Sequence, residues 1–358
     1  MEKIAQGCCF LPPSLFWELK LFVGRCRHWF LLLVAAVFFI AGCSSEAERS
    51  DFLLGTICTL RITGGDDVDL DAAFARIRAI EARMSRHRPG SEVRKVGIAK
   101  NAGMQLSAET CLVLGKALEF GELSGGLFDI TIAPVAELWG FDTEHAAVPT
   151  AAAIEALLPR VDYRSVQLDE NCHVRTAPRQ RLDLGAIAKG YAADEAARIL
   201  RQRKVTRGLV NLGGNVLVFG HKKDNTPWKI GIQDPLKTAR TPMGTLEIKE
   251  GAIVTSGIYE RFIEENGMRY HHILNPATGY PEENNLAGVS VMTSSALMAD
   301  ALSTSLFLLG IDKGCALLDQ FPGSGAVFIT KDKKITTCGA ASQVFTCLNE
   351  SYTVVERR

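Results

Sequence analysis

Residues 181–198 read RLDLGAIAKGYAADEAAR, a strand-like entry, a glycine-containing corner and the start of a helix. Gly185 and Gly190 allow the backbone to approach a neighbour or a ligand closely. The unpaired N–H groups at the N-terminus of a helix favour anions. Asp183 and Lys189 stand at this helix start, so the segment predicts either a site for a phosphate-bearing ligand or an ordinary strand-to-helix turn with a solvated lysine.

Outward from this corner, apolar periodicity predicts helices and strands in no regular βαβ order. Helices are expected over 70–85, 108–120 with Gly121 as its cap, 150–157, 187–203 and 295–309. Strands are expected over 52–63, 208–219, 228–233, 244–248, 252–258, 270–274, 327–330, 334–337 and 344–348. The pattern predicts an α+β fold with a mixed, mainly antiparallel sheet, packed helices and a smaller loop-rich subdomain over 134–181. Neither a P-loop motif nor a G-x-G-x-x-G motif occurs, which argues against both nucleotide-binding folds.

The amino-terminal part differs from the rest. An apolar run over 29–41 follows basic residues, is too short for a typical membrane span, and ends in Ile40-Ala41-Gly42-Cys43. This ending resembles a bacterial lipoprotein signal, in which cleavage precedes a cysteine that is then lipidated. The expected organisation is a signal peptide over 1–42, a polar tether over 43–51, a folded domain over 52–348 and a tail over 349–358. The alternative is an anchor helix that stays attached, and both predict an exported protein held at the membrane on its periplasmic side, by lipid at Cys43 in the first case.

Composition narrows the class of protein further. The chain has 358 residues, 47% hydrophobic and 22% charged, which is typical of a globular protein. Forty basic and forty acidic residues cancel, and no basic block appears, so a nucleic-acid partner is not expected. The cysteines of the expected mature chain have no C-x-x-C spacing, which argues against zinc and favours scattered buried thiols. Cys338 and Cys347 flank a predicted hairpin and form the one pair proposed for a disulfide test.

A carboxylate and a hydroxyl stand on one stripe of the helix over 295–309. Asp300 and Thr304 are four residues apart, in line with the apolar positions of that helix, and should face inward. A buried carboxylate needs a cation or several donors. The pair therefore predicts a magnesium half-site, because Mg²⁺ takes few protein oxygens, or else Asp300 caps a neighbouring backbone turn.

Three shorter motifs are each open to two interpretations. In HHILNPATG over 271–279, one histidine should face inward, and an inward His272 is either a general base or a donor to a backbone carbonyl. Arg86 and Arg88 either grip a pyrophosphate or are solvated. NLGGN over 211–215 is either a bulge or a place where backbone approaches a flat ring.

Taken in order, these motifs resemble those of the FAD:protein FMN transferases, the ApbE-type flavin transferases. The resemblance covers about residues 52–348 and includes seven ordered matches: LGT at 54–56, MSRHRPGSE at 84–92, SGGLFDITIAP at 124–134, DLGAIAKGYAAD at 183–194, NLGGN at 211–215, HHILNPATGYP at 271–281 and the helix with Asp300 and Thr304. One difference is His87, where the family often has an aromatic residue.

The resemblance implies a T-fold-like protein that binds FAD in a cleft between its parts. With Mg²⁺, it implies transfer of the FMN half of FAD to a threonine hydroxyl in the flavinylation motif of a partner protein, such as a membrane redox-complex subunit, with release of AMP. It places the metal at the Asp300 carboxylate, the Thr304 hydroxyl and the Ala186 carbonyl, and assigns proton removal to His272. The implied FAD contacts are Leu54, Leu127, Phe128, Asp129, Asp183, Lys189 and Ile273.

Other functions use the same residues. Water in place of the acceptor hydroxyl would make the protein an FAD pyrophosphatase that yields FMN and AMP. A lipoprotein that binds or scavenges FAD without chemistry would have no need of a metal, and a general phosphodiesterase would cleave dinucleotides that lack flavin.

Overall fold

The computed structural model describes residues 46–97, 103–141, 143–222, 224–237 and 241–356. Its centre is a nine-stranded sheet, antiparallel at every pairing except the last. In spatial order the strands are β1 (Glu46–Leu53), β2 (Thr56–Thr63), β6 (Arg207–Leu212), β7 (Asn215–Phe219), β10 (Gly251–Gly257), β13 (Leu286–Thr293), β14 (Gly325–Thr330), β15 (Lys334–Gly339) and β17 (Thr353–Val354). The predicted α+β class and its mainly antiparallel sheet are confirmed.

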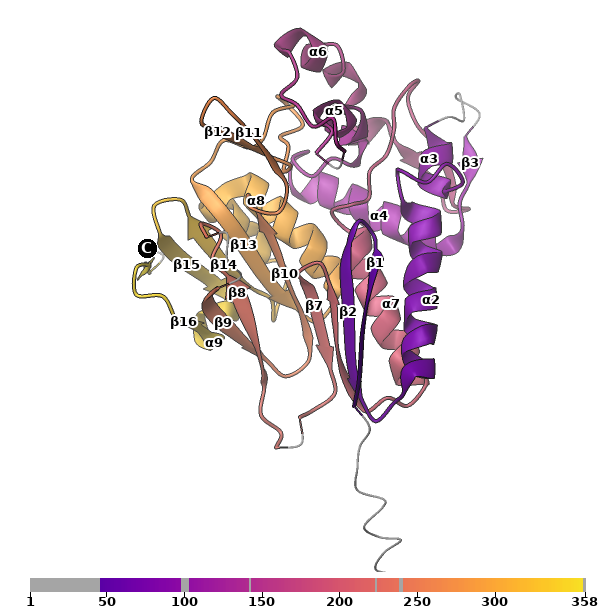
Figure 1. The fold of residues 1–358 in the computed structure, drawn as a ribbon. Helices are drawn as coiled ribbons and strands as arrows, with labels where there is room; N and C mark the ends of the chain where they lie inside the picture. The colour runs from indigo at the N-terminus through magenta and orange to yellow at the C-terminus, as the bar shows by residue number, and fades with distance from the viewer. Residues whose placement is uncertain (1–45, 98–102, 142, 223, 238–240, 357–358) are drawn as a thin grey trace, which may run out of the picture. The chain divides into compact units, whose positions relative to one another are not determined.

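Long helices cover one face of this sheet (Figure 1). The helices α2 (Asp67–Met84), α7 (Ala188–Gln202) and α8 (Ala296–Leu318) pack on its strands, and α4 (Ala108–Leu123) packs against α8. Their apolar stripes form the main core with the inward residues of the strands, as alternation on β7 illustrates: Leu217 and Phe219 face the helices, and Val218 faces away from them. Helix α8 is long and apolar enough, by length and composition, to cross a membrane, but 61% of its most apolar window is buried.

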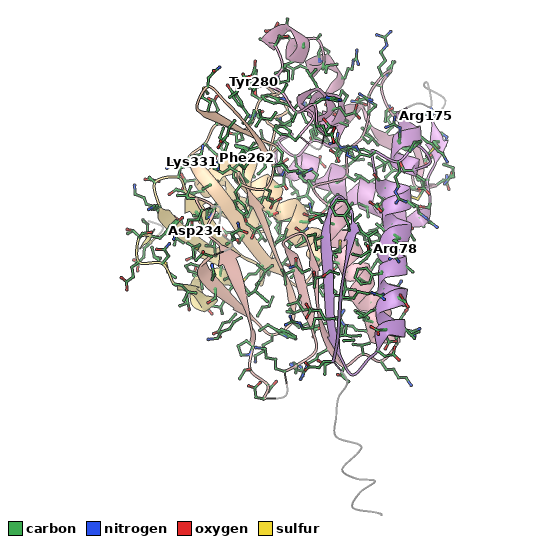
Figure 2. The ribbon with its side chains drawn as sticks, in the orientation of Figure 1. Arg78, Arg175, Asp234, Phe262, Tyr280 and Lys331 are labelled. Atoms are coloured by element: carbon green, nitrogen blue, oxygen red, sulfur yellow. A yellow bond between two sulfur atoms is a disulfide. The ribbon has the colours of Figure 1, made fainter. Side chains whose placement is uncertain are left out.

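The opposite face of the sheet is covered by a second, smaller layer. A three-stranded sheet orders β16 (Phe345–Cys347), β9 (Pro242–Ile248) and β8 (Trp228–Gln233), and α9 (Ala341–Val344) lies beside it. Asp234, labelled in Figure 2, is buried at the end of β8 and accepts a hydrogen bond from the Tyr352 hydroxyl (2.6 Å). Within the predicted tail over 349–358, Tyr352 is buried and β17 extends the main sheet, so the folded part continues beyond the expected boundary at residue 348.

The expected loop-rich region over 134–181 is built from short elements. It holds α5 (Ala133–Trp139), the predicted helix as α6 (Ala151–Glu155), 3-10 turns over Leu158–Arg160 and Tyr163–Ser165, and two strands of a small sheet. That sheet orders β3 (Met104–Gln105), β5 (His173–Arg175) and β4 (Gln167–Leu168), while α3 (Glu92–Val96) precedes it in the chain. Trp139 centres a separate small core and donates from Nε1 to the Gly279 carbonyl (2.8 Å), which joins α5 to the segment after β12.

Beside that small core lies the hairpin of β11 (Phe262–Glu265) and β12 (Met268–His271). Its Ile263 and Tyr270 pack against the Trp139 core, and Figure 2 labels Phe262 on this hairpin and Tyr280 nearby. The hairpin therefore links the short-element region to the segment that carries the two histidines.

Several predicted boundaries were wrong for local reasons. The strand expected over 52–63 is a hairpin that turns at Leu54-Gly55, so residues 46–51 of the expected tether belong to β1. The strand expected over 208–219 also turns back, at Gly213-Gly214. Both residues of each turn have positive φ, which two-residue hairpins of primed type require and which glycine supplies most easily. Cys43 and the predicted signal peptide lie outside the described residues.

Helices α4 and α8 run further than their patterns indicated. Helix α4 continues through Gly121 to Leu123, because Gly121 packs against the Tyr163 ring and does not end the helix. Helix α8 continues past Gly310, whose φ of 76° kinks it. Strand β13 was not predicted, because its sequence LAGVSVMT is buried on both faces and lacks alternation.

The prediction of scattered free thiols was also wrong. Disulfides join Cys111 to Cys172 and Cys315 to Cys338, the first between α4 and the small sheet region, the second between α8 and β15. The suggested Cys338 and Cys347 pair does not form, and Cys347 is a free thiol. Sequence separations of 61 and 23 residues hid both pairs, because only the tertiary fold brings these cysteines together.

Candidate functional site

The candidate site is built where the first turns of α7 and α8 meet. Gly190 permits this approach, since a Cβ atom at that position would lie 2.1 Å from the Ala296 carbonyl oxygen. The Gly190 N–H donates to Oδ2 of Asp300 (2.8 Å), and Asp300 is 3% exposed. Asp300 thus faces inward as predicted, and it does cap a neighbouring turn through one of its two oxygens.

This bond changes the hydrogen bonding of the first turn of α7. In a regular helix the N–H of residue 190 would bond to the carbonyl of residue 186. Here that N–H is directed to Asp300, and no described residue donates to the Ala186 carbonyl or to Oδ1 of Asp300. Both oxygen acceptors are therefore left without a donor among the described residues.

Thr304 adds a hydroxyl one turn along α8. Its Oγ1 lies 3.2 Å from Oγ of Ser256 on β10, which in turn lies 2.8 Å from Oγ of Ser303. The Ser303 hydroxyl is also bonded to the Asp300 carbonyl within its own helix (2.9 Å), whereas the Thr304 hydroxyl bonds, among the described residues, to Ser256 alone. Ser256 was not predicted, because a serine in a strand carries no distinctive sequence signal.

These donors fit a hard divalent cation. A carboxylate, a hydroxyl and a backbone carbonyl are the ligand types that Mg²⁺ prefers, and Mg²⁺ commonly takes only one or two carboxylates from a protein. The described residues contain no cluster of three or more His, Cys, Asp or Glu. The open Ala186 carbonyl is the specific observation that agrees with the predicted ligand set.

Asp183 and Lys189 lie on either side of the corner before α7. Asp183 is half-buried, pairs with Nε of Arg86 (3.0 Å) and accepts from the Gly185 N–H (2.8 Å). Lys189 donates from Nζ to the Gly185 carbonyl (3.2 Å). Arg86 is thus bound within the chain, and Arg88 pairs with Glu81 (3.1 Å), so neither arginine is a solvated surface residue without contacts.

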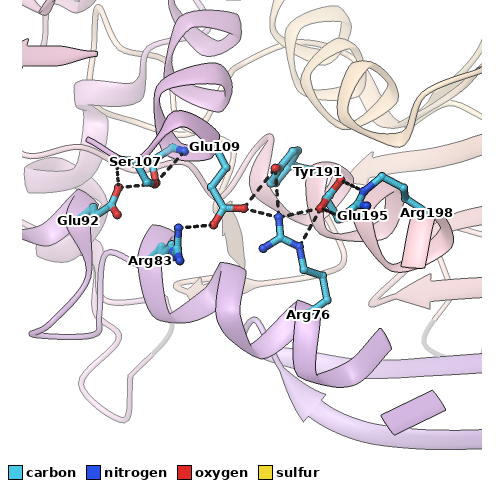
Figure 3. Close-up of polar contacts among 9 residues, drawn as sticks. Arg76, Arg83, Glu92, Ser107, Glu109, Tyr191, Glu195 and Arg198 are labelled. Atoms are coloured by element: carbon cyan, nitrogen blue, oxygen red, sulfur yellow. Dashed lines mark hydrogen bonds and ion pairs between the residues drawn. The ribbon is translucent and has the colours of Figure 1, made fainter. Parts of the chain in front are cut away.

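A polar network fixes α7 against α2 and α4 (Figure 3). Arg76 of α2 binds Glu195 of α7 (2.8 Å from Nε) and also Glu109 of α4. The Tyr191 hydroxyl of α7 is 3.3 Å from the same Glu109 carboxylate. Burial and the charges of Glu195 and Glu109 raise the pKa of Tyr191 to about 12, so its hydroxyl stays protonated and donates. These bonds therefore fix the first turns of α7 against α2 and α4.

Of the three residues at the glycine turn that were predicted to contact FAD, two are buried and one is half-buried. Asp129 is buried, and its carboxylate accepts from the Thr131 N–H (2.7 Å), the Thr131 hydroxyl (2.6 Å) and the Tyr163 N–H (2.9 Å). Phe128 is buried against Phe120, with ring centroids 5.9 Å apart. Both shape this turn from inside, while Leu127 is half-buried at its surface.

The remaining predicted residues lie on two other segments. Leu54 is half-buried at the tip of the β1–β2 hairpin, and its N–H donates to Glu81 (3.0 Å). Ile273 is buried in the main core. A hollow lined by Leu118, Val166 and His173 lies beside the small sheet and contains none of the predicted site residues.

The two adjacent histidines face different environments. His271 is the buried one, edge-on to Phe307, and burial lowers its pKa to about 4. His272 is half-buried, so the inward member of the pair is His271. Its Nδ1 is 3.3 Å from the Arg261 carbonyl, and burial with the charges of Arg261 and Lys189 holds its pKa well below the usual value. Because a carbonyl only accepts, Nδ1 carries the proton and Nε2 keeps its lone pair.

The fold and site together define a class of protein: a mixed α+β fold with hard oxygen donors at a crossing of two helices. The particular family follows from comparison with known proteins. The chain belongs to the ApbE family, whose pattern its residues 54–329 match.

Relatives and solved structures agree with this assignment. An FAD:protein FMN transferase of Treponema pallidum is 33% identical over 87% of this chain and 94% of its own, and one of Klebsiella pneumoniae is 35% identical over 86% and 96%. The crystal structure of the ApbE protein of Thermotoga maritima has a TM-score of 0.75 at 32% identity and covers 81% of this chain and 96% of its own. The flavin transferase ApbE of Vibrio cholerae, at 24% identity and a TM-score of 0.76, shares the fold.

Proposed function

We propose that this protein is an FAD:protein FMN transferase that moves the FMN half of FAD to a threonine hydroxyl of a partner protein, with Mg²⁺ and with release of AMP. The observation that carries the proposal is a pair of oxygens without a donor among the described residues, Asp300 Oδ1 and the Ala186 carbonyl, left so by the bond from the Gly190 N–H to Asp300 Oδ2. The names of the relatives support the reaction class, and the donor set supports the metal.

In this reaction the threonine oxygen forms a bond to the phosphorus of the FMN half, and the bond from that phosphorus to the bridging oxygen breaks. The bridging oxygen leaves with AMP. Mg²⁺ held by Asp300, Thr304 and Ala186 would supply positive charge to the phosphate oxygens. Lys189 adds a second positive charge at the same helix start, where the backbone N–H groups also favour anions.

The proton of the attacking hydroxyl needs an acceptor. His272 suits this role because its ring is neutral at pH 7 and its Nε2 lone pair is left open by the bond at Nδ1. A half-buried position lets an incoming polypeptide reach it, which the buried His271 does not allow.

The test combines purified protein, FAD, Mg²⁺ and an acceptor protein that carries the threonine motif. Intact-mass measurement should show acceptor heavier by one FMN less one water, with an equal amount of AMP by chromatography. Release of FMN and AMP without modified acceptor would favour the pyrophosphatase, and stable FAD with no AMP would favour a binding lipoprotein. A threonine-to-valine acceptor is the matched control.

We further propose that the protein is exported and lipid-anchored through Cys43, and that its acceptor is a membrane redox-complex subunit. Two disulfides support an oxidising compartment, because such bonds are rare in cytosolic proteins. The test is the mass of the amino-terminal peptide of membrane-extracted protein. An amino-terminal peptide that begins upstream of Cys43 and carries no lipid would overturn the proposed anchor.

A further inference from the structure

Two asparagines of one hairpin turn differ sharply in their hydrogen bonding. Oδ1 of Asn211 accepts from the Gly214 N–H (2.8 Å) and so closes the turn between β6 and β7. Asn215 is only 3% exposed, yet its Nδ2 has no hydrogen-bond partner among the described residues. Buried amides in native proteins almost always have partners, so Asn215 calls for an explanation.

Asn215 lies on the face of the sheet that supports the site. It pairs with Leu212, which pairs in turn with Cys58, so the three form a row on the face that packs against the helices. Burial raises the pKa of the Cys58 thiol to about 11, and the charge of Lys189 is near enough to oppose that rise. Helix α7, whose first turn carries Lys189, packs against β6 and β7, the strands that hold Leu212 and Asn215.

The Asn215 end of the row lies near Ser256 and Thr304. On the next strand Ile253 pairs with Val216, so continuing the register places Val254 beside Asn215. Ser256, two residues further on, shares this face and is a diagonal neighbour of Asn215. Since Ser256 contacts the Thr304 hydroxyl (3.2 Å), Asn215 lies between the Lys189 side and the Thr304 side of the candidate site.

We propose that the Asn215 carboxamide binds FAD directly, donating from Nδ2 to an acceptor oxygen of the dinucleotide on the floor of the site. The assignment rests on the proposed function, because it takes FAD as the ligand. The acceptor oxygen belongs either to a phosphate or to the flavin ring. Bound FAD would then satisfy the amide that the chain itself leaves without a partner.

The experiment compares wild-type protein with Asn215→Leu, which removes the amide but keeps the branched shape and the number of side-chain heavy atoms. FAD and FMN binding are followed by flavin fluorescence with Mg²⁺, and ADP binding by competition. The Kd for FAD should rise about tenfold, the effect of one lost hydrogen bond to a ligand. The melting temperature without ligand should stay equal or rise, because an unsatisfied buried group is removed. Asn215→Ala provides a second variant if the leucine is not accommodated.

Comparing FAD, FMN and ADP distinguishes a phosphate oxygen from a flavin oxygen as the acceptor. Weaker binding of FAD, FMN and ADP alike would indicate a phosphate, and weaker FAD and FMN with unchanged ADP would indicate the flavin ring. Asn211→Leu is the matched control, which should lower the melting temperature because it removes a bond that closes the turn.

Two results would overturn the assignment. Equal FAD Kd values for wild type and both Asn215 variants would mean that water alone satisfies the amide, with the proposed function intact. Failure of wild-type protein to bind FAD would overturn the proposed function and the assignment with it.

Discussion

The first turns of α7 and α8 are each held by an aspartate of the other helix, and the two aspartates differ in how fully they are bonded. Asp194 of α7 accepts from the Ser295 hydroxyl (2.8 Å) and from the N–H groups of Ala296 (2.8 Å) and Leu297 (3.0 Å). Asp300 of α8 accepts one bond, from Gly190 (2.8 Å). Both are buried aspartates at one crossing, with three donors against one.

The difference separates a structural carboxylate from one with capacity to bind a ligand. A buried carboxylate needs cations or several donors. Asp194 has its donors within the chain, as does Asp129 at the glycine turn. Asp300 has one donor among the described residues, which leaves Oδ1 available to a cation, so donor number distinguishes roles that sequence pattern alone does not.

Replacing Asp300 should have the largest effect on activity. Asp300→Ala removes the only carboxylate among the proposed metal ligands, and loss of several kcal/mol of charge stabilisation corresponds to a transfer rate about 10³-fold lower. The measurement is acceptor flavinylation across a range of Mg²⁺ concentrations, with the melting temperature recorded for each protein. An Asp300→Ala variant that transfers FMN at the wild-type rate would contradict the metal assignment.

Replacing His272 should have the next largest effect. His272→Asn removes the proposed proton acceptor and should lower kcat by about 10²-fold. In wild type the lowered pKa keeps the ring neutral, so the rate should stay flat as the pH falls from about 7 to 6 and decrease only in more acidic solution.

The neighbouring His271 supplies the control for that pH profile. Its folded-state pKa of about 4 is below the unfolded value, so the unfolded chain binds more protons as the pH falls through 6.5, and stability is lost over that range. His271→Phe should reduce this loss of stability while leaving the pH dependence of the rate unchanged. A rate profile with a midpoint near pH 6.5 in wild type would contradict a neutral His272.

The adjacent hydroxyls of Ser303 and Thr304 on α8 allow the same comparison between a group already bonded within its helix and a group that can bind a ligand. The expected effect is smaller. Thr304→Val keeps the shape of the side chain but removes the proposed ligand oxygen, and should raise the Mg²⁺ concentration for half-maximal activity about tenfold. Ser303→Ala removes a hydroxyl already bonded to the Asp300 carbonyl, and should leave that concentration nearly unchanged. Equal effects of the two substitutions would mean that Thr304 has no special role.

Local patterns predicted much of this site, and long-range pairings account for most of what was missed. The inward stripe with Asp300 and Thr304 follows from helix periodicity over a few residues, and it is present. Whether Asp300 or Asp194 is saturated depends on donors about one hundred residues away in sequence, which no local pattern contains.

The fold shows the same division between local and distant information. The four long helices were predicted because their stripes are regular, while β13 was missed because strands buried on both faces do not alternate. One long strand was predicted across each of the Leu54-Gly55 and Gly213-Gly214 turns, because apolar residues continue on both sides of the turn.

Replacing Asp194 should have the opposite effect to replacing Asp300. We expect a large loss of stability with little change in the transfer rate. Asp194→Ala leaves the two N–H groups at the start of α8 without their acceptor, which should cost about 3 kcal/mol and lower the melting temperature by roughly 5–10 °C. The Arg76 network still holds α7, and Gly190 still binds Asp300, so transfer by the folded protein should fall only a few-fold. Thermal unfolding and single-turnover rates well below the melting temperature measure the two quantities separately. A fall in rate as large as that of Asp300→Ala, at an unchanged melting temperature, would mean that both aspartates act on the substrate and that donor number does not separate their roles.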